Sequence, residues 1–286
     1  MDKIITLRDK RKLGYEEYGD PHGKPVFLFH GIPGSRIFHP PDEITTKLGV
    51  HLITVDRPGY GLSSFQPGRR ILDWPGDVIQ LANHLGIKRV AVAGHSGGGP
   101  YAAVCGYGLP GRVTAAAIVC GIGPLDTPAA TKDMWWLNRV GFTTGRYMPW
   151  LLWQIPIWFF YRKGASKPAD VMERGADSRP EADELLWEDP AIRNVCYAST
   201  VEAFRQGTRG QAWDVRLISR QWGFRLEDIH VPVFLWHGEA DRDTPVTMGR
   251  YVASKIPGCR ATICEGEAHL LIFPYWEEIL QSLISP

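Results

Sequence analysis

The chain has 286 residues, of which 44% are hydrophobic and 22% are charged, so it carries enough apolar material to bury a sizeable core. This composition excludes intrinsic disorder, collagen and a coiled coil as the state of the whole chain. The 32 Lys and Arg residues against 31 Asp and Glu leave a formal net charge of +1. Such a balance gives no electrostatic attraction to nucleic acid or to an anionic membrane, and neither is expected as a partner.

Short apolar runs rich in β-branched residues alternate with longer helix-like stretches, which is typical of a parallel sheet covered by helices. Two N-terminal segments, Ile4–Leu7 and Lys12–Tyr18, are expected to form an antiparallel hairpin at the sheet edge. The expected strands that follow are Val26–Phe29, His51–Val55, Arg89–Ala93, Val113–Cys120, Val231–Trp236 and Arg260–Cys264. The expected helices are Trp74–Leu85, Ser96–Tyr107, Pro245–Ile256 and His269–Ser285. We therefore predict an α/β fold with a mostly parallel central sheet of about eight strands, flanked by helices.

The segment from Pro124 to Asp228 interrupts this alternation. It shows no clear strand pattern and contains eight of the eleven tryptophans. A structureless loop of this length is implausible in a compact domain, so we predict an inserted α-helical cap over residues 124–228. Residues 1–123 and 229–286 then form the core domain.

The five cysteines are odd in number and have no spacing typical of zinc ligands, which predicts neither a disulfide framework nor a metal site. The first 20 residues carry charges throughout, unlike a signal peptide, so we expect a cytoplasmic protein. The stretch Tyr147–Tyr161 is uncharged but contains Pro149 and Pro156 and is shorter than the roughly 20 residues that span a bilayer. No transmembrane segment is predicted.

Gly94-His95-Ser96-Gly97-Gly98 lies between an expected buried strand and an expected helix. This is the G-x-S-x-G pattern of a nucleophile elbow, in which glycines allow a strained turn that exposes the serine above the sheet. The pentapeptide alone could be a structural glycine turn. Its position between strand and helix identifies Ser96 as a candidate nucleophile.

His30-Gly31-Ile32-Pro33-Gly34 follows an earlier strand and should lie at the same edge of the sheet. A tetrahedral oxyanion needs two preorganised N–H donors, and we expect the amides of Ile32 and Gly97 to supply them. Pro33 has no N–H and is excluded from this role. The competing interpretation is a simple Pro-Gly turn before a helix.

A serine nucleophile needs a base and an acid that orients the base. Among nine histidines, only His269 combines a position after the last strand with a turn of small residues, whereas His30, His95 and His237 are expected to be structural. Glu239, Asp241 and Asp243 follow the preceding strand, and Asp126 is a further alternative. We choose Asp241 as the acid and expect Asp243 to cap the helix that begins at Pro245.

Together with the Asp56–Ser63 segment, these motifs resemble the α/β-hydrolase superfamily in order and position. The resemblance covers about 180 residues of the core, and it implies that the insertion is a cap that shapes the substrate pocket. It assigns Asp56 and Arg57 a supporting role. Relatives with an aspartate nucleophile are disfavoured by Ser96, while proline iminopeptidases, which have a similar His-Gly-x-Pro-Gly turn, remain possible. The sequence shows no obvious acidic cluster in the cap to hold a substrate amine.

Ten aromatic residues lie between Asp133 and Tyr161. Aromatic clusters usually serve packing, and they can also line an apolar pocket. We expect the pocket over Ser96 to be lined by Trp135, Trp136, Trp150, Trp153, Trp158 and Phe159.

The sequence therefore predicts a serine hydrolase, without a cofactor, that cleaves small carboxylic esters with apolar or aromatic groups. A P-loop, an H-E-x-x-H pair and a dinucleotide-binding turn are all missing from the sequence. Lactone hydrolysis, carbon–carbon bond hydrolysis and amide or peptide cleavage use the same three residues and stay open. A non-catalytic ligand receptor on the same fold is a further alternative, and the oligomeric state is left undetermined.

Overall fold

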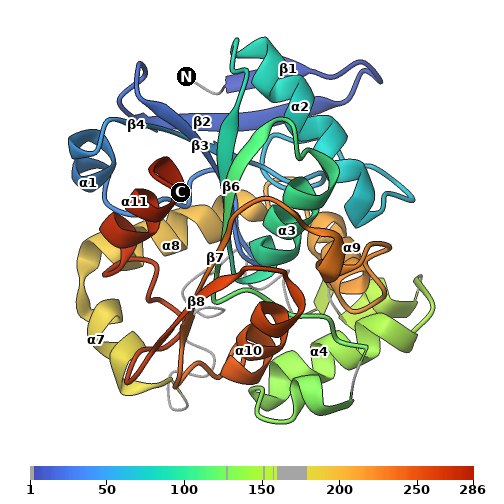
Figure 1. The fold of residues 1–286 in the computed structure, drawn as a ribbon. Helices are drawn as coiled ribbons and strands as arrows, with labels where there is room; N and C mark the ends of the chain where they lie inside the picture. Colours follow the sequence, from blue (N-terminus) through green and yellow to red (C-terminus); the bar gives the residue numbers. More distant parts are fainter. Residues whose placement is uncertain (1–2, 127, 151, 157, 160–178) are drawn as a thin grey trace.

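The computed structural model describes residues 3–126, 128–150, 152–156, 158–159 and 179–286. Its centre is an eight-stranded sheet, as predicted, in the order β1-β2-β4-β3-β5-β6-β7-β8 (Figure 1). β1 and β2 pair antiparallel with each other, β2 pairs antiparallel with β4, and the remaining neighbours are parallel. The strand bounds are β1 Lys3–Thr6, β2 Lys12–Gly19, β3 Lys24–Phe29, β4 Val50–Val55, β5 Val90–His95, β6 Val113–Val119, β7 Val233–Gly238 and β8 Arg260–Cys264.

Helices cover both faces of the sheet, and alternate residues of each strand face opposite layers. In β3, Phe27 and Phe29 belong to one core cluster, while Val26 and Leu28 belong to the other. The first cluster packs under α2 (Trp74–His84), α3 (Gly99–Gly108) and α10 (Val246–Lys255), and the second under α1 (Asp42–Lys47) and α11 (Trp276–Ile284). Both faces are therefore apolar, as a parallel sheet between two helical layers requires.

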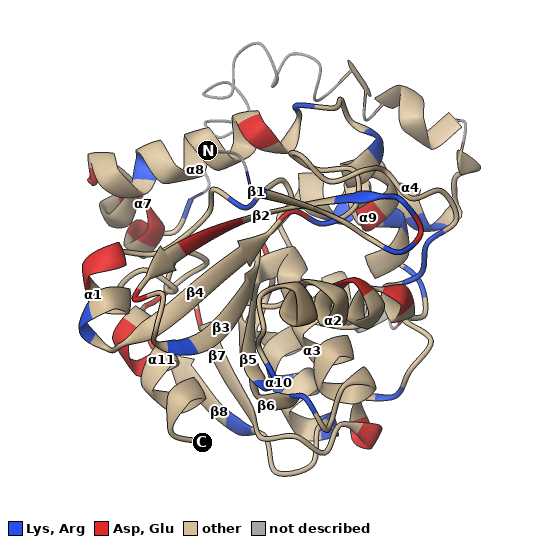
Figure 2. Cartoon of the chain, turned by 90° about the horizontal axis from the view of Figure 1, so that it is seen from above, with Lys and Arg blue, Asp and Glu red and all other residues tan. Residues whose placement is uncertain are grey.

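The described residues between β6 and β7 contain helices and no strand. They form two contacting pairs, α4 (Trp136–Tyr147) with α9 (Arg209–Ile218) and α7 (Glu181–Glu188) with α8 (Pro190–Ala203). Seen from above, the two pairs lie over different sides of the sheet, and acidic and basic residues are interspersed around the fold (Figure 2). Residues 127, 151, 157 and 160–178 of the expected cap lie outside the described residues, and four of these belong to Tyr147–Tyr161.

Among the described residues, no helix combines the length and the apolar character needed to cross a membrane. The expected helix His269–Ser285 begins later than predicted, at Trp276. The backbone N–H groups of His269 and Leu270 bond to a side chain, and Pro274 disfavours helical geometry in the residue before it. Residues 269–275 therefore form turns, which places His269 in a loop rather than on a helix.

Candidate active site

Ser96 follows β5 directly and sits at the carboxyl end of the sheet. Its backbone has φ of +54°, a left-handed conformation that is costly for any residue with a side chain. A Cβ at Gly94 would collide with the Gly98 carbonyl oxygen, and a Cβ at Gly98 would collide with the Phe29 carbonyl oxygen. The glycines therefore let the chain turn tightly enough to begin α3 three residues after Ser96.

The loop after β3 packs against this elbow. A Cβ added at Gly31 would lie 3.2 Å from the Ser96 Cβ and 3.6 Å from its Oγ, and one added at Gly97 would lie 2.6 Å from Cγ1 of Ile32. The structure therefore places the two predicted oxyanion donors, the amides of Ile32 and Gly97, on adjoining segments beside the candidate nucleophile.

A buried ionic cluster holds the backbone of the loop that follows β3. Arg57 donates to the carbonyl oxygens of His30 and Gly31, the latter at 2.9 Å, and its Nε donates to Asp214 Oδ2 of α9 at 2.8 Å. Asp214 also accepts from Arg69 and from the Tyr101 hydroxyl. Burial alone would raise the pKa of Asp214, but the charges of Arg69 and Arg57 hold that pKa below 3.8.

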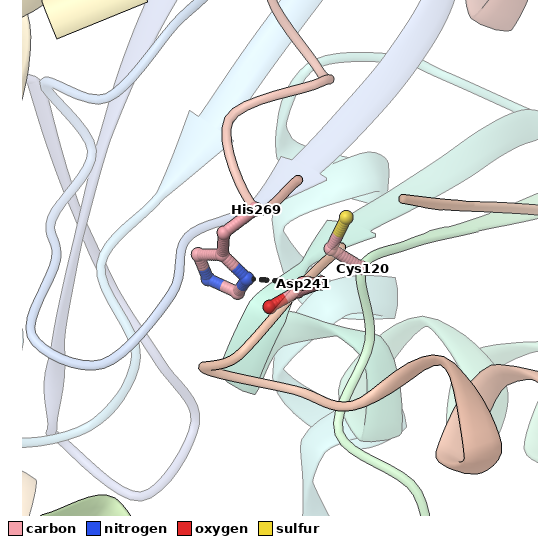
Figure 3. Close-up of side chains that lie close together, drawn as sticks. All are labelled: Cys120, Asp241 and His269. Atoms are coloured by element: carbon pink, nitrogen blue, oxygen red, sulfur yellow. Dashed lines mark hydrogen bonds and ion pairs between the residues drawn. The ribbon is translucent and has the colours of Figure 1, made fainter. Parts of the chain in front are cut away.

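His269 and Asp241 come from the turns after the neighbouring strands β8 and β7, and their side chains meet (Figure 3). His269 Nδ1 donates to Asp241 Oδ2 at 2.8 Å, and Thr244 Oγ1 lies 2.8 Å from the same oxygen. Asp241 Oδ1 accepts the backbone N–H groups of Asp243 and Thr244, each at 2.9 Å. Both oxygens of the carboxylate are thus hydrogen-bonded. The imidazole uses Nδ1 for this contact, and its Nε2 takes no part in it.

Electrostatics at this pair favours the charged forms. Burial opposes the charge on His269, but the adjacent Asp241 carboxylate raises the pKa of the imidazole above 6.5. Burial likewise opposes the charge on Asp241, but His269 lowers the pKa of that carboxyl below 3.8. The arrangement stabilises the imidazolium that forms when His269 takes a proton.

The alternative acids of the sequence lie at the surface or bond to other residues. Asp126 is exposed, and Glu239 forms a surface ion pair with Arg250. Asp243 does not cap α10, contrary to our prediction. Its Oδ1 instead accepts from Asn138 of α4 at 2.8 Å, and the residue that precedes α10 is Pro245, which makes no side-chain capping bond.

The histidines expected to be structural have partners in the core. His95 donates its Nε2–H to the His269 carbonyl oxygen at 2.9 Å, and burial together with the nearby His269 lowers the pKa of His95 to about 3. His237 donates to the Thr244 carbonyl oxygen at 2.6 Å. His30 contacts the Gly31 carbonyl oxygen through Nδ1 at 2.8 Å. His95 thus holds the backbone of the candidate base.

A cavity of about 470 Å³ opens above Ser96, and His269 also lines it. Of the six expected aromatic residues, Trp135 and Trp153 lie on its wall. The prediction is wrong for the other four. Trp136, Trp158 and Phe159 are exposed by 66%, 42% and 64%, and Trp150 packs edge-on against Trp213 at 4.7 Å between ring centroids. None of these four residues is among those that line the cavity.

Several residues of the cavity wall were not predicted from the sequence. The apolar ones include Leu137, Val140, Phe142 and Met148 of α4 and the loop that follows it. Charged ones are Arg179, Asp183, Arg242 and Asp243. Helical spacing does not group the α4 residues, because Leu137 and Phe142 lie about 140° apart around the helix axis. No local pattern distinguishes Asp183 from the exposed acidic residues of α7.

Among the described residues, one cluster has a composition that could ligate a metal. Ligand atoms of Cys120, Asp241 and His269 lie within 4.8 Å of one another. Burial raises the pKa of the Cys120 thiol well above 9, so a metal would have to displace a tightly held proton. His269 Nδ1 and Asp241 already satisfy each other, and this donor set fits acid–base chemistry better than metal binding.

Comparisons with known proteins agree with this geometry. The family model described as "Alpha/beta hydrolase family" matches residues 26–281. A non-heme haloperoxidase of Rhodococcus erythropolis is 30% identical over 287 residues, covering 93% of this chain and 92% of the relative. An esterase structure from Exiguobacterium antarcticum superposes with a TM-score of 0.72 at 18% identity and covers 100% of this chain and 98% of that one.

A proline iminopeptidase of Xylella fastidiosa is 33% identical over 120 residues, which is 39% of this chain. The match spans only about a third of that relative's length, 36%. The family match, by contrast, extends from β3 to α11 and includes the elbow, the acid and the base. The chain therefore belongs to the alpha/beta hydrolase family.

Proposed function

We propose that the protein is a serine hydrolase that cleaves carboxylic esters of apolar or aromatic small molecules through an acyl-enzyme intermediate. The observation that carries this proposal is the 2.8 Å bond between His269 and the buried Asp241, on a cavity that Ser96 also lines. With Nδ1 engaged, Nε2 of His269 is the nitrogen available for the serine proton.

The reaction would proceed in two halves. Ser96 Oγ attacks the ester carbonyl carbon while its proton passes to Nε2 of His269, and the amides of Ile32 and Gly97 bind the resulting oxyanion. Collapse breaks the bond to the alcohol oxygen, which takes the proton from His269. Water, deprotonated by His269, then attacks the acyl carbon, and the acid leaves as Ser96 regains its proton.

Residues 124–228 act in this proposal as a cap over the core formed by residues 1–123 and 229–286. The apolar wall supplied by Trp135, Phe142 and Trp153 supports an apolar substrate group. All five cysteines are free thiols, four of them buried, which supports a reducing compartment and hence the cytoplasm.

Labelling with a fluorophosphonate tests the proposal, because the reagent phosphonylates only an activated serine. The wild type should be labelled stoichiometrically and Ser96→Ala not at all, whereas the exposed Ser254→Ala serves as a matched control and should behave as the wild type. Stoichiometric labelling of Ser96→Ala would refute the assignment of the nucleophile. A wild type that neither reacts nor turns over short esters would refute the hydrolase itself.

Amide cleavage next to a free amine is a second candidate. Asp243 places a carboxyl group on the cavity wall, where a protonated amine could bind, although Arg179 and Arg242 lie on the same wall. Comparing an aminoacyl p-nitroanilide with an uncharged p-nitrophenyl ester of similar size separates the two. A larger kcat/KM for the anilide would favour the second candidate.

A further inference from the structure

The carboxylate of Asp183 reaches from helix α7 of the cap to the backbone of the candidate base. Its Oδ2 accepts the N–H of His269 at 3.1 Å, and its Oδ1 accepts the N–H of Leu270 at 2.7 Å. The residue is only 4% exposed. Both oxygens of one buried acid are therefore committed to two successive amides of the loop that carries His269.

The same loop is held from the core side as well. The His269 carbonyl oxygen accepts the bond from His95 Nε2, and the His95 ring is stacked on Phe38 with 5.3 Å between centroids. His95 directly precedes Ser96 and is part of β5. The backbone of His269 is thus fixed on one side by the strand that carries the nucleophile and on the other side by the cap.

Burying a carboxylate is costly unless its oxygens are bonded, and this carboxylate lies close to the imidazole. Burial raises the pKa of Asp183 to about 6, with the His269 charge opposing the rise and the Asp241 charge adding to it. In turn, the charges of Asp241, Asp243 and Asp183 all raise the pKa of His269. Asp183 therefore acts on the imidazole both through the backbone and through its charge.

We propose that Asp183 is a positioning residue for His269, so that the base is correctly placed relative to Ser96 only when α7 packs against the core. The inference rests on the proposed function, since it takes His269 to be the base. A base displaced by about 1 Å can cost about 100-fold in rate. The two bonds from Asp183 fix the backbone of the loop that carries His269.

The variant Asp183→Asn tests this role, because its amide can accept only one of the two N–H groups and carries no charge. Glu184→Gln, on the exposed side of the same helix, is the matched control. We expect the rate of fluorophosphonate labelling and kcat of Asp183→Asn to fall 10- to 100-fold, with KM changing less than threefold. The acid limb of the pH–rate profile should also move to lower pH.

A second readout does not depend on catalysis. NMR titration of the His269 imidazole should show a lower pKa in Asp183→Asn and an unchanged one in Glu184→Gln. If Asp183→Asn does not fold, Asp183→Ser leaves room for water and the same two measurements apply. Labelling rates and imidazole titrations equal to those of Glu184→Gln would overturn the positioning role. If the wild type is not labelled but the pKa of His269 is still lower in Asp183→Asn than in the wild type, the hydrolase proposal is refuted and the role of Asp183 is retained.

Discussion

Asp241 fixes the tautomer of His269 and also sets its pKa. Catalysis needs the neutral imidazole, and the Asp241 carboxylate raises the imidazole pKa, so activity should fall as the pH drops through a value above 6.5. In Asp241→Asn the negative charge is gone, and the acid limb should move to lower pH. The variant should also lose about 10⁴-fold in kcat, because the asparagine amide favours the wrong tautomer.

A pH–rate profile of the two proteins checks both effects, with thermal unfolding as the control for folding. An acid limb that stays in place after the substitution would contradict the role given to Asp241. The same measurement on Asp126→Asn, an exposed acid after β6, should leave the profile unchanged.

For single residues, prediction from the sequence depended on which strand each residue follows along the chain. Ser96, Asp241 and His269 each follow a strand, and the carboxyl ends of parallel strands meet at one edge, so their approximate placement could be inferred. Asp183 could not be inferred, because its partners lie 86 and 87 residues away and nothing local separates it from Glu181 and Glu184. Trp136 and Trp158 were misplaced for a related reason, since tryptophan content does not tell which face of a helix is covered.

Helix α9 contacts the core through the buried carboxylate of Asp214. Its carboxylate forms ion pairs with both Arg57 and Arg69, and all three side chains are buried. Asp214→Asn should therefore lower the free energy of unfolding by about 3–5 kcal/mol, because it leaves two buried guanidinium groups without an anion. The exposed Glu239→Gln, which breaks the surface pair with Arg250, should cost at most about 1 kcal/mol.

Urea unfolding of the two variants measures this difference. The pKa of Asp214 is held below its ordinary value, so its stabilisation is complete above about pH 4, where the unfolded carboxyl is also ionised. It is lost as the pH falls through the pKa of the folded state. An equal decrease in the free energy of unfolding of Asp214→Asn and Glu239→Gln at pH 7 would contradict the stabilising role of the Asp214–Arg57–Arg69 cluster.

The elements themselves were largely predictable. β8 has the predicted bounds, and the other strands differ from their predictions by a few residues, because β-branched runs bounded by turns are a direct signal. The start of α11 was missed because the hydrophobic pattern of residues 269–275 continues that of the helix, while tertiary bonds to Asp183 and His95 hold this segment in turns.

At the scale of the whole molecule, the described residues border the cavity with the carboxyl edge of the sheet on one side and the helices between β6 and β7 on the other, and most of these side chains are apolar. We expect kcat/KM for an ester with a phenylacetyl or hexanoyl group to exceed that for a carboxylate-bearing ester of equal size by at least 10-fold. An apolar group gains free energy when it is buried against this wall, whereas a carboxylate must give up its hydration. Initial rates on paired p-nitrophenyl esters measure this preference. Equal rates would show that the apolar wall does not select the substrate.

Two carboxylates from the helices between β6 and β7 hold the loops of the candidate site: Asp214 supports the turn with Gly31 through Arg57, and Asp183 supports the loop with His269. Helices grafted from a relative in their place would leave two guanidinium groups and two amides without their partners unless they carried acids at these two positions. When these helices are exchanged between relatives, the acids at positions 183 and 214 should therefore be kept, and the residues that line the cavity can be varied.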